Sequence, residues 1–240
     1  MRTKTDLLKT NIGASFLIAL LGACTQPTNE GDAGPDESVE AVVEQHDYVD
    51  VWLEQLEVGS RELYSARESV VDSVGLSEGD VVADIGSGTG LYSLLFAEEV
   101  GASGRVFAED IEPLFLDLVN QRADDSGIDN ITAVLGREND VSLPEKSIDL
   151  VFIADTYHYF GDRQAVMKSV FDSMKPGGEL VIVDYDLEEG ETRASDKQHV
   201  RFGKAGVISE LEYIGFEFLE DVAVEGLSEN YFVRFKRPEE

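Results

Sequence analysis

Residues 80–91 read DVVADIGSGTGL, and this stretch decides the fold. The apolar run DVVADI is typical of a buried parallel strand, and glycine-rich sequence follows it directly. Gly86, Gly88 and Gly90 permit a tight turn and let a ligand approach the backbone closely. Because a helical segment over 89–100 comes next, the order of strand, glycine-rich turn and helix favours a ligand-binding turn in an α/β sheet.

Along the rest of the chain, short apolar segments typical of strands alternate with longer segments of helical periodicity. The predicted strands are 80–85, 105–109, 131–135, 148–154, 179–185, 217–224 and 231–236, and the predicted helices are 61–74, 89–100, 113–126, 163–174 and 204–214. The Lys175-Pro176-Gly177-Gly178 segment is expected to form a turn before the fifth strand. The alternation predicts a mostly parallel, seven-stranded sheet with helices on both faces and a terminal antiparallel hairpin.

The chain is strongly acidic. Its 240 residues include 49 Asp and Glu against 19 Lys and Arg, which gives a formal net charge of −30. Because contacts to nucleic acids depend on cationic side chains, we do not expect a nucleic acid as partner. A single cysteine excludes a disulfide framework within the chain and a zinc site built from thiolates, and we predict no metal site.

The first residues have the pattern of a secretory signal. Arg2, Lys4 and Lys9 form a cationic region, and residues 11–23 form an uncharged, mostly apolar run that is too short for an ordinary membrane span. This run ends in the sequence LGAC, whose cysteine is Cys24. LGAC resembles the bacterial lipobox, which implies that Cys24 becomes the lipidated first residue of the mature protein. The alternative is an uncleaved membrane anchor.

The signal suggests how the chain is organised. We expect a lipoprotein signal peptide at 1–23, the lipidated cysteine with a flexible tether at 24–38, an N-terminal helical cap at 39–78 and the α/β domain at 79–240. Because the basic flank of the signal stays inside, the α/β domain is expected outside the cytoplasm, anchored to the membrane on its periplasmic side. Thr25 stands where some lipoproteins carry an aspartate for inner-membrane retention, which favours the outer membrane.

The glycine-rich turn carries the most specific motif of the chain, Asp-x-Gly-x-Gly-x-Gly, from Asp84 to Gly90. A dinucleotide-binding turn requires a third small residue where this chain has Leu91, and this disfavours a nucleotide-dependent oxidoreductase. The motif resembles motif I of class I S-adenosylmethionine-dependent methyltransferases. The resemblance implies a Rossmann-like fold with S-adenosyl-L-methionine as cofactor. The cofactor-binding residues that it implies in this turn are Asp84, Gly86, Ser87, Gly88 and Gly90.

An acid at the end of the second strand fits the same family. Asp110 lies twenty residues after Gly90, and the sequence DIEP that begins at Asp110 matches the family pattern. A carboxylate in this place can accept hydrogen bonds from both ribose hydroxyls of a nucleoside. The resemblance therefore implies that Asp110 binds the cofactor, and its neighbour Glu109 is expected to be solvated.

Two later loops complete the implied cofactor site. After the third strand, family members place an acid or an amide against the adenine, and Glu138 is our first choice over Asn139 and Asp140. The end of the fourth strand faces the transferable methyl group in class I enzymes. Asp155, the first residue after that strand, is therefore the last of the expected cofactor-binding residues.

The residues that follow Asp155 are candidates for catalysis. The segment 155–160 reads DTYHYF and would place three polar rings at the mouth of the ligand crevice. Because the ordinary pKa of a histidine side chain is near neutrality, His158 is a candidate general base, and Tyr157 is a second candidate catalytic residue. The alternative for His158 is a packed side chain whose hydrogen bonds are satisfied by its neighbours.

The resemblance extends to a subgroup of uncharacterised methyltransferase-domain proteins over roughly residues 58–237. In this fold, the helix before motif I and the segment after the fifth strand often roof the substrate pocket. The candidate substrate-binding residues are Arg61, Tyr64, Arg67, His199 and Arg201. The guanidinium groups of Arg61, Arg67 and Arg201 suit a carboxylate or phosphate, and ion pairing at the surface is the alternative.

Two hypotheses follow for the function. The first is methyl transfer to an unidentified small-molecule or lipid-associated acceptor, by in-line displacement at the sulfonium methyl group. The second is a non-catalytic, extracytoplasmic ligand-binding module on the same fold. Export favours the second, because the cofactor is made in the cytoplasm. The complete motif and Asp110 favour the first. Neither hypothesis predicts a particular oligomeric state.

Overall fold

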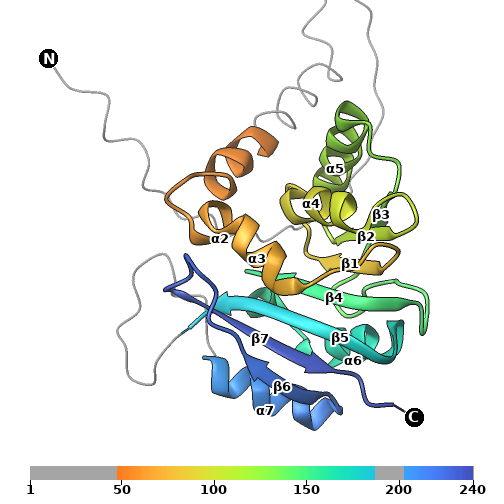
Figure 1. Ribbon diagram of the computed structural model, residues 1–240, viewed down its shortest axis with the longest axis vertical. Coiled ribbons are helices and arrows are strands. Elements are labelled where there is room, and N and C mark those ends of the chain that lie inside the picture. The colour runs from red at the N-terminus through yellow and green to blue at the C-terminus, as the bar shows by residue number, and fades with distance from the viewer. Residues whose placement is uncertain (1–47, 187–202, 240) are drawn as a thin grey trace, which may run out of the picture. The chain divides into compact units, whose positions relative to one another are not determined.

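The computed structural model describes residues 48–186 and 203–239. The expected signal peptide, Cys24 and the tether lie outside these residues, as do His199 and Arg201. Residues 48–56 are helical, and the chain then continues through the helices and strands that are labelled in Figure 1. In this described part of the chain, none of the helices has the length and apolar character needed to cross a membrane.

A seven-stranded sheet organises the fold, with the strand order β3-β2-β1-β4-β5-β7-β6. The strands are β1 (Val81–Ile85), β2 (Arg105–Asp110), β3 (Ile131–Leu135), β4 (Ile148–Ala154), β5 (Met174–Tyr185), β6 (Glu217–Asp221) and β7 (Asn230–Lys236). The first five strands pair in parallel, whereas β7 pairs antiparallel with both β5 and β6. The structure therefore confirms the predicted parallel sheet with an antiparallel end.

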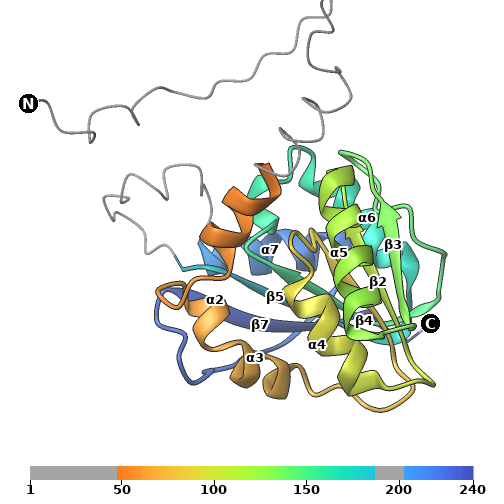
Figure 2. The same ribbon diagram turned by 90° about the horizontal axis from the view of Figure 1, so that it is seen from above.

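Helices cover both faces of this sheet. They are α2 (Glu62–Ser65), α3 (Arg67–Val74), α4 (Leu91–Val100), α5 (Pro113–Ser126), α6 (Arg163–Ser173) and α7 (Lys204–Ile214), with a short 3-10 helix η1 (Tyr157–Tyr159) after β4. Figure 2 shows α3, α4 and α5 on one face, and α6 and α7 on the other. The strand order reverses between β1 and β4, so the carboxyl ends of these two strands border the crevice in which ligands of such folds bind.

A hydrophobic core lies on each face of the sheet. On one face, Phe96 of α4 packs with Phe152 of β4, their ring centroids 5.0 Å apart. On the other face, Met167 of α6 and Leu211 of α7 pack against residues of the same strands, such as Ile153. Because β1 and β4 are buried on both sides, their sequences are nearly continuous apolar runs without alternation.

The predicted helix over 61–74 is divided in the structure, and α2 and α3 are separate helices. The Nη1 atom of Arg67 donates a hydrogen bond to the carbonyl oxygen of Tyr64, at 2.7 Å. A side chain thus satisfies a carbonyl group that the next turn of a continuous helix would otherwise use. The backbone of Ala66 has φ −98° and ψ 10°, outside the values of a regular helix. The helical cap therefore contains a break that periodicity does not reveal.

The Lys175-Pro176-Gly177-Gly178 segment also differs from its prediction. It belongs to β5, which begins at Met174, so α6 ends one residue earlier than predicted. Ile148 pairs with Met174 and Leu150 pairs with Glu179, so the segment forms an irregularity between these two pairs. The predicted turn between helix and strand is therefore wrong, and the bend lies inside the strand.

The helical residues 48–56 pack beside α5. The ring centroids of Trp52 and Phe115 lie 6.0 Å apart at an angle of 77°, an edge-to-face contact. The guanidinium group of Arg122, also on α5, forms an ion pair with the carboxylate of Glu57. These two contacts connect the start of the described chain to the helix that follows β2.

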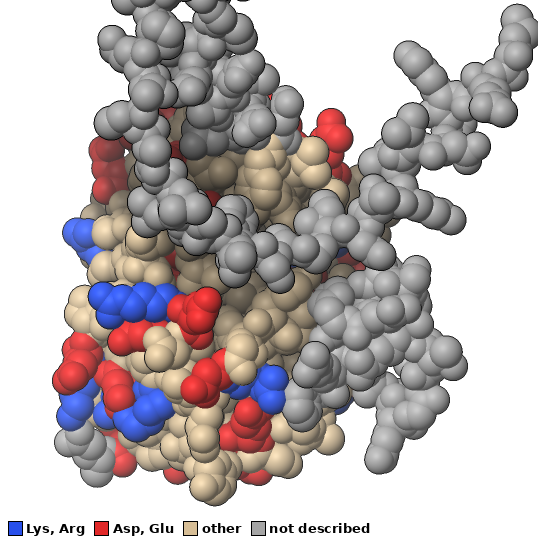
Figure 3. Space-filling view, turned by 180° about the vertical axis from the view of Figure 1, so that it is seen from behind, with Lys and Arg blue, Asp and Glu red and all other residues tan. Residues whose placement is uncertain are grey.

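Basic and acidic side chains are interspersed on the surface. On the face in Figure 3, Lys and Arg lie among Asp and Glu. Ion pairs of this kind join Lys175 to Asp149, at 2.7 Å, and Arg163 to Glu210, at 2.9 Å. On the described part of that face, no basic stripe of the kind that binds a phosphate backbone is present.

Candidate active site

A cavity of about 1270 Å³ lies at the carboxyl ends of the parallel strands. It is lined by the loops that follow β1, β2, β3 and β4, by Tyr185 at the end of β5, and by side chains from the helical residues 48–56. A drug-sized ligand usually occupies a pocket of about 300–1,000 Å³. The cavity therefore has room for a cofactor and an acceptor molecule together, and it lies where the topology predicts a ligand.

The glycine-rich turn after β1 forms one wall of this cavity. Gly86, Gly88 and Gly90 have φ angles of 67°, 52° and 78°, in the left-handed region that side chains other than glycine rarely adopt. At Gly86 there is also no space for a side chain, because a Cβ atom would lie 2.2 Å from Cγ2 of Thr156. Both the turn and its contact with the loop after β4 thus depend on glycine at this position.

Asp110 lies beside this turn, at the end of β2. Its carboxylate accepts hydrogen bonds from the backbone amides of Gly88 and Glu112, each at 2.9 Å, and it lines the cavity. Burial raises the pKa of Asp110, although the two backbone donors act in the opposite direction. The structure thus holds an oriented carboxylate at the place where the two hydroxyl groups of a ribose can be bound.

Asp84, the acid of the motif, lies at the end of β1 and is buried. The hydroxyl of Ser93 donates a hydrogen bond to its carboxylate, at 2.5 Å. Burial raises the pKa of Asp84 to about 7, against the opposing effect of the Ser93 hydrogen bond. Asp84 lines the cavity, so a group that titrates near neutrality lies at the glycine-rich turn.

Glu109 is buried, which corrects the prediction that it is solvated. Only 3% of the residue is exposed, and a Cβ atom added at Gly136 would lie 1.6 Å from its Oε1 atom. The amide of Gly86 donates to Oε2 at a distance of 3.4 Å. Burial, and then the neighbouring charge of Asp110, raise the pKa of Glu109 to about 8. The position of β2 between β1 and β3 could have revealed this, since two successive residues of an inner strand cannot both face solvent.

The buried carboxyl group of Glu109 predicts how stability depends on pH. Its pKa is about 8 in the folded protein and 4.5 in an ordinary environment, so the unfolded chain loses this proton at lower pH than the folded one. The contribution of Glu109 to stability is therefore complete below pH 4.5 and lost as pH rises through 8. We expect Glu109→Gln, which cannot ionise, to exceed the native protein in free energy of unfolding by about 5 kcal/mol near pH 9.

Urea denaturation between pH 5 and pH 9 measures this difference. The control is Glu99→Gln, which removes a carboxylate from an exposed position on α4 and so matches the change in net charge. We expect the free energy of unfolding of Glu109→Gln to exceed that of the native protein and of Glu99→Gln by an amount that grows as pH rises. If this difference in free energy of unfolding is constant between pH 5 and pH 9, Glu109 is already ionised in the folded protein.

The loop after β3 brings two of the three adenine candidates to the cavity. Glu138 and Asn139 both line it, together with Arg137. Asp140 does not line it, because its backbone forms a tight bridge with Arg137 and its carboxylate accepts from the amide of Ser142, at 2.6 Å. Glu138 therefore stays a prediction, with Asn139 as the alternative in the same wall.

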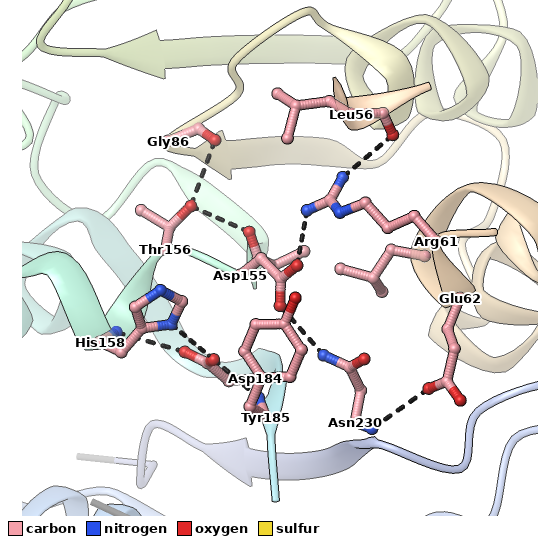
Figure 4. A network of polar contacts seen from close by, with 12 residues as sticks. Leu56, Arg61, Glu62, Gly86, Asp155, Thr156, His158, Asp184, Tyr185 and Asn230 are labelled. Carbon is pink, nitrogen blue, oxygen red and sulfur yellow. Dashed lines mark hydrogen bonds and ion pairs between the residues drawn. The ribbon is translucent and has the colours of Figure 1, made fainter. Parts of the chain in front are cut away.

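Asp155 lies at the centre of a polar network that joins three parts of the chain (Figure 4). Its φ angle of 49° turns the side chain towards Arg61, whose Nη2 atom lies 2.6 Å from Oδ2 of Asp155. The amide nitrogen of Asn230 donates to the other carboxylate oxygen, at 3.0 Å. Arg61 also donates to the carbonyl oxygen of Leu56, at 3.2 Å. Asp155 and Arg61 both line the cavity, so its wall includes a charge pair that is already satisfied.

His158 lines the cavity next to this network, and its ring contacts a buried acid. The Nδ1 atom lies 2.7 Å from Oδ1 of Asp184, and only 5% and 3% of the two side chains are exposed. Asp184 also accepts from the backbone amides of His158, at 3.2 Å, and of Tyr185, at 2.7 Å. Asp184 is not among the residues predicted from sequence, although an acid at the carboxyl end of the fifth parallel strand is a signal of the same kind as Asp110.

Tyr157 does not lie at the cavity, which corrects its prediction as a catalytic residue. Its ring is buried in the core beneath α6 and α7, and its hydroxyl donates to the carboxylate of Glu210, at 2.9 Å. The one-residue step from Tyr157 to His158 in η1 turns the two side chains in different directions. Tyr157 therefore stabilises the core, whereas His158 faces the ligand space.

Two of the predicted substrate contacts are also corrected. Tyr64 and Arg67 do not line the cavity, and the guanidinium carbon of Arg67 lies 4.7 Å from the centroid of the Tyr64 ring. This cation–π contact, with the Arg67 hydrogen bond described above, engages both residues within the helical cap. Of the predicted substrate contacts within the described residues, Arg61 alone lines the cavity. His199 and Arg201 lie outside the described residues.

The cavity wall fits S-adenosylmethionine. The hydroxyl of Ser87 in the glycine-rich turn is buried, and it has no hydrogen-bond partner among the described residues. Buried polar groups normally have a partner, so this hydroxyl indicates a polar ligand at the turn. The oriented carboxylate of Asp110 is the acceptor that a ribose requires. Because glycine has no Cβ atom, a ligand can approach the backbone of the turn closely.

Comparison with known proteins shows which family the chain belongs to. A family described as "Methyltransferase domain" matches residues 76–215. A curated relative from Vibrio vulnificus, the ubiquinone/menaquinone biosynthesis C-methyltransferase UbiE, is 29% identical over 116 residues, which are 48% of this chain and 45% of the relative. The chain thus spans about half the length of this curated relative.

Solved structures share the fold. A S-adenosylmethionine-dependent methyltransferase from Aquifex aeolicus has a TM-score of 0.67 at 24% identity, over 77% of this chain and 96% of that one. The [4+2]-cyclase SpnF has a TM-score of 0.66 at 14% identity, over 85% and 96%. The family match covers more than half of the chain, from the residues before β1 to the end of α7. The chain therefore belongs to the methyltransferase-domain family.

Proposed function

We propose that the protein transfers the methyl group of S-adenosylmethionine to a small-molecule or lipid-associated acceptor. The observation that carries this proposal is the cavity, which joins the Asp110 side of the glycine-rich turn to a second region with Arg61, His158 and Tyr159 in its wall. Methyl transfer requires two reactants held close together, aligned and away from water. A cavity with room for both supports this chemistry better than a site for one ligand.

The cofactor supplies an electrophilic methyl group on its sulfonium ion. In the proposed binding mode, Asp110 accepts hydrogen bonds from the ribose hydroxyls, and Glu138 or Asn139 contacts the adenine. The glycine-rich turn brings the backbone and the Ser87 hydroxyl close to the cofactor, with Asp84 beneath them. Asp155 stays a predicted cofactor contact, and its ion pair keeps Arg61 in the wall of the cavity.

We also propose that the protein is a lipoprotein, attached to the membrane on the periplasmic side through Cys24. The LGAC sequence behind an apolar run supports this proposal. Such an anchor would place the cavity within reach of lipid-associated acceptors. Labelling of cells with a radioactive fatty acid tests it, since the native chain should incorporate the label and Cys24→Ala should not.

Transfer of a labelled methyl group tests the proposed activity. The protein is incubated with S-adenosylmethionine that carries a tritiated methyl group, and with small-molecule and lipid extracts of the cells that make it. We expect tritium in one extract fraction, formed with the native protein and lost with Asp110→Ala. A protein that binds the cofactor but labels no fraction would contradict the proposal.

The alternative function is a ligand-binding module without turnover. It is supported by the general rule that a fold does not fix an activity, since the same fold occurs in a protein described as a [4+2]-cyclase. A bound cofactor with no methyl transfer to any fraction would support this alternative.

A further inference from the structure

One wall of the cavity is an apolar stripe on the helical residues 48–56. The stripe consists of Tyr48, Trp52 and Leu56, which line the cavity, whereas the other residues of this helix do not. Each member follows the last by four residues, so all three share one face of the helix, and Asp50 on the opposite face is exposed. Because four residues advance a helix by about 6 Å, the apolar stripe forms a wall about 12 Å long.

The C-terminal end of the apolar stripe is held at the glycine-rich turn. The Cδ1 atom of Leu56 lies 3.6 Å from the position that a Cβ atom would occupy at Gly88. Arg122 of α5, which forms the ion pair with Glu57, also donates a hydrogen bond to the carbonyl oxygen of Thr89, at 2.8 Å. These contacts fix the helix against the same turn that the proposed cofactor would approach.

Both ends of the apolar stripe lead to Asp110. Gly88, which Leu56 contacts, donates its amide to the carboxylate of Asp110. Trp52, one turn further along the helix, packs on Phe115, which lines the cavity five residues after Asp110. The apolar stripe therefore borders the part of the cavity where the ribose is proposed to bind.

The side chains of this wall are only partly covered by protein. Trp52 and Phe115 are half-buried, and Tyr48 is 39% exposed. Ile111, the residue after Asp110, also lines the cavity and is 60% exposed. Covering such apolar surface with a ligand is favourable, because the surface is then removed from water. A carboxylate for the sugar beside aromatic surface for a flat base suits a nucleoside.

We propose that the helix 48–56 is part of the cofactor site and that Trp52 packs against the adenosine half of S-adenosylmethionine. This inference rests on the cofactor site of the proposed function. Asp110 holds the sugar by hydrogen bonds, and Trp52 contributes apolar contact area that excludes water from the nucleoside. The segment before α2 thus binds a ligand, in addition to covering α5.

The fluorescence of Trp52 tests this proposal in the native protein, because the chain has a single tryptophan. S-adenosylhomocysteine is titrated into the protein, and the indole is excited at the red edge of its absorption, where adenine does not absorb. We expect a saturable change in fluorescence with the Kd that calorimetry gives for the same sample. Binding by calorimetry without any change in fluorescence would overturn the proposal, and this result requires no variant to fold.

Substitution of Trp52 measures the size of the contribution. Trp52→Ala should weaken the binding of S-adenosylhomocysteine by about 10-fold, as removal of an aromatic side chain from a base does, and Trp52→Phe should lose less. The control is Val51→Ala, which changes a neighbour that is 49% exposed and does not line the cavity. It should bind as the native protein does. Thermal denaturation without ligand checks that each variant folds, and native affinity in a folded Trp52→Ala would contradict the proposal.

A second ligand assigns the contact to the adenosine half. Methylthioadenosine contains the nucleoside and the sulfur of the cofactor but lacks its amino acid group. If Trp52 contacts the nucleoside, Trp52→Ala should weaken the binding of methylthioadenosine and of S-adenosylhomocysteine by the same factor. A loss confined to S-adenosylhomocysteine would place Trp52 against the amino acid group and overturn the assignment.

The same titrations separate this inference from the proposed function. If S-adenosylhomocysteine binds and Trp52 does not respond, the role of Trp52 is wrong while the proposed methyl transfer stands. If Trp52 responds and no methyl group is transferred to any acceptor, the proposed function fails while the inference stands, because it concerns binding. If S-adenosylhomocysteine does not bind to the folded protein, both fail together.

Discussion

Asp110→Ala is expected to weaken the binding of S-adenosylmethionine and S-adenosylhomocysteine by about 100-fold or more. The carboxylate of Asp110 lines the cavity and is held by the amides of Gly88 and Glu112. A hydrogen bond to a charged group contributes about 1.5–3 kcal/mol, and a ribose offers two such bonds. Isothermal titration calorimetry of the native protein and the variant with both ligands measures the change.

Two further variants make this result specific. Asp110→Asn keeps an oxygen that can accept from one of the two backbone amides, so it should disturb the turn less than Asp110→Ala does and still lose much of the affinity. Asp125→Ala removes one carboxylate from an exposed position near the end of α5 and should bind as the native protein does. Native affinity in a folded Asp110→Ala would show that the ribose lies elsewhere.

Gly86→Ala is expected to destabilise the protein by about 3 kcal/mol and to abolish cofactor binding at accessible concentrations. The added methyl group would lie 2.2 Å from Cγ2 of Thr156 and 2.5 Å from its Oγ1, at a position with φ 67°. A left-handed residue other than glycine costs about 1–2 kcal/mol, and overpacking costs about 1–3 kcal/mol. Thermal and urea denaturation measure the loss of stability.

The crowding and the backbone strain at Gly86 can be measured separately. Gly75 has φ 72°, but no atom lies within 4 Å of the Cβ position there, so Gly75→Ala carries the backbone cost alone. Thr156→Ala removes both atoms that approach most closely, and combining it with Gly86→Ala should restore part of the stability. If Gly86→Ala costs no more than Gly75→Ala, the contact between the turn and Thr156 is not what the structure implies.

The sequence predicts the inner strands of the sheet best, because they are buried, whereas the mostly exposed edge strand β6 ends three residues earlier than predicted. Strands that are covered on both faces read as apolar runs, and the bounds predicted for Ile148–Ala154 and Ile131–Leu135 match β4 and β3. The break at Ala66 was not predictable, because it depends on a hydrogen bond from the side chain of Arg67. The segment 175–178 was predicted as a turn before the fifth strand, but it lies inside β5. Its place in the strand depends on pairing with β4, which is a tertiary contact that no local pattern reveals.

The site shows the same division between local and tertiary information. The glycine motif and Asp110 are local patterns in sequence, and the structure brings them together in one wall of the cavity. The pairing of Arg61 with Asp155 joins residues that are far apart in the chain, so no motif reveals it. Tyr157 and His158 look equivalent in sequence, and only the direction of η1 assigns one to the core and the other to the cavity.

The central claim is that the cavity binds S-adenosylmethionine. Calorimetric titration of the protein with S-adenosylhomocysteine, combined with a thermal denaturation of the same sample, tests this claim most directly. The structure predicts saturable binding at one site and a higher melting temperature in the presence of the ligand. A folded protein that shows neither heat of binding nor a shift in melting temperature would contradict it.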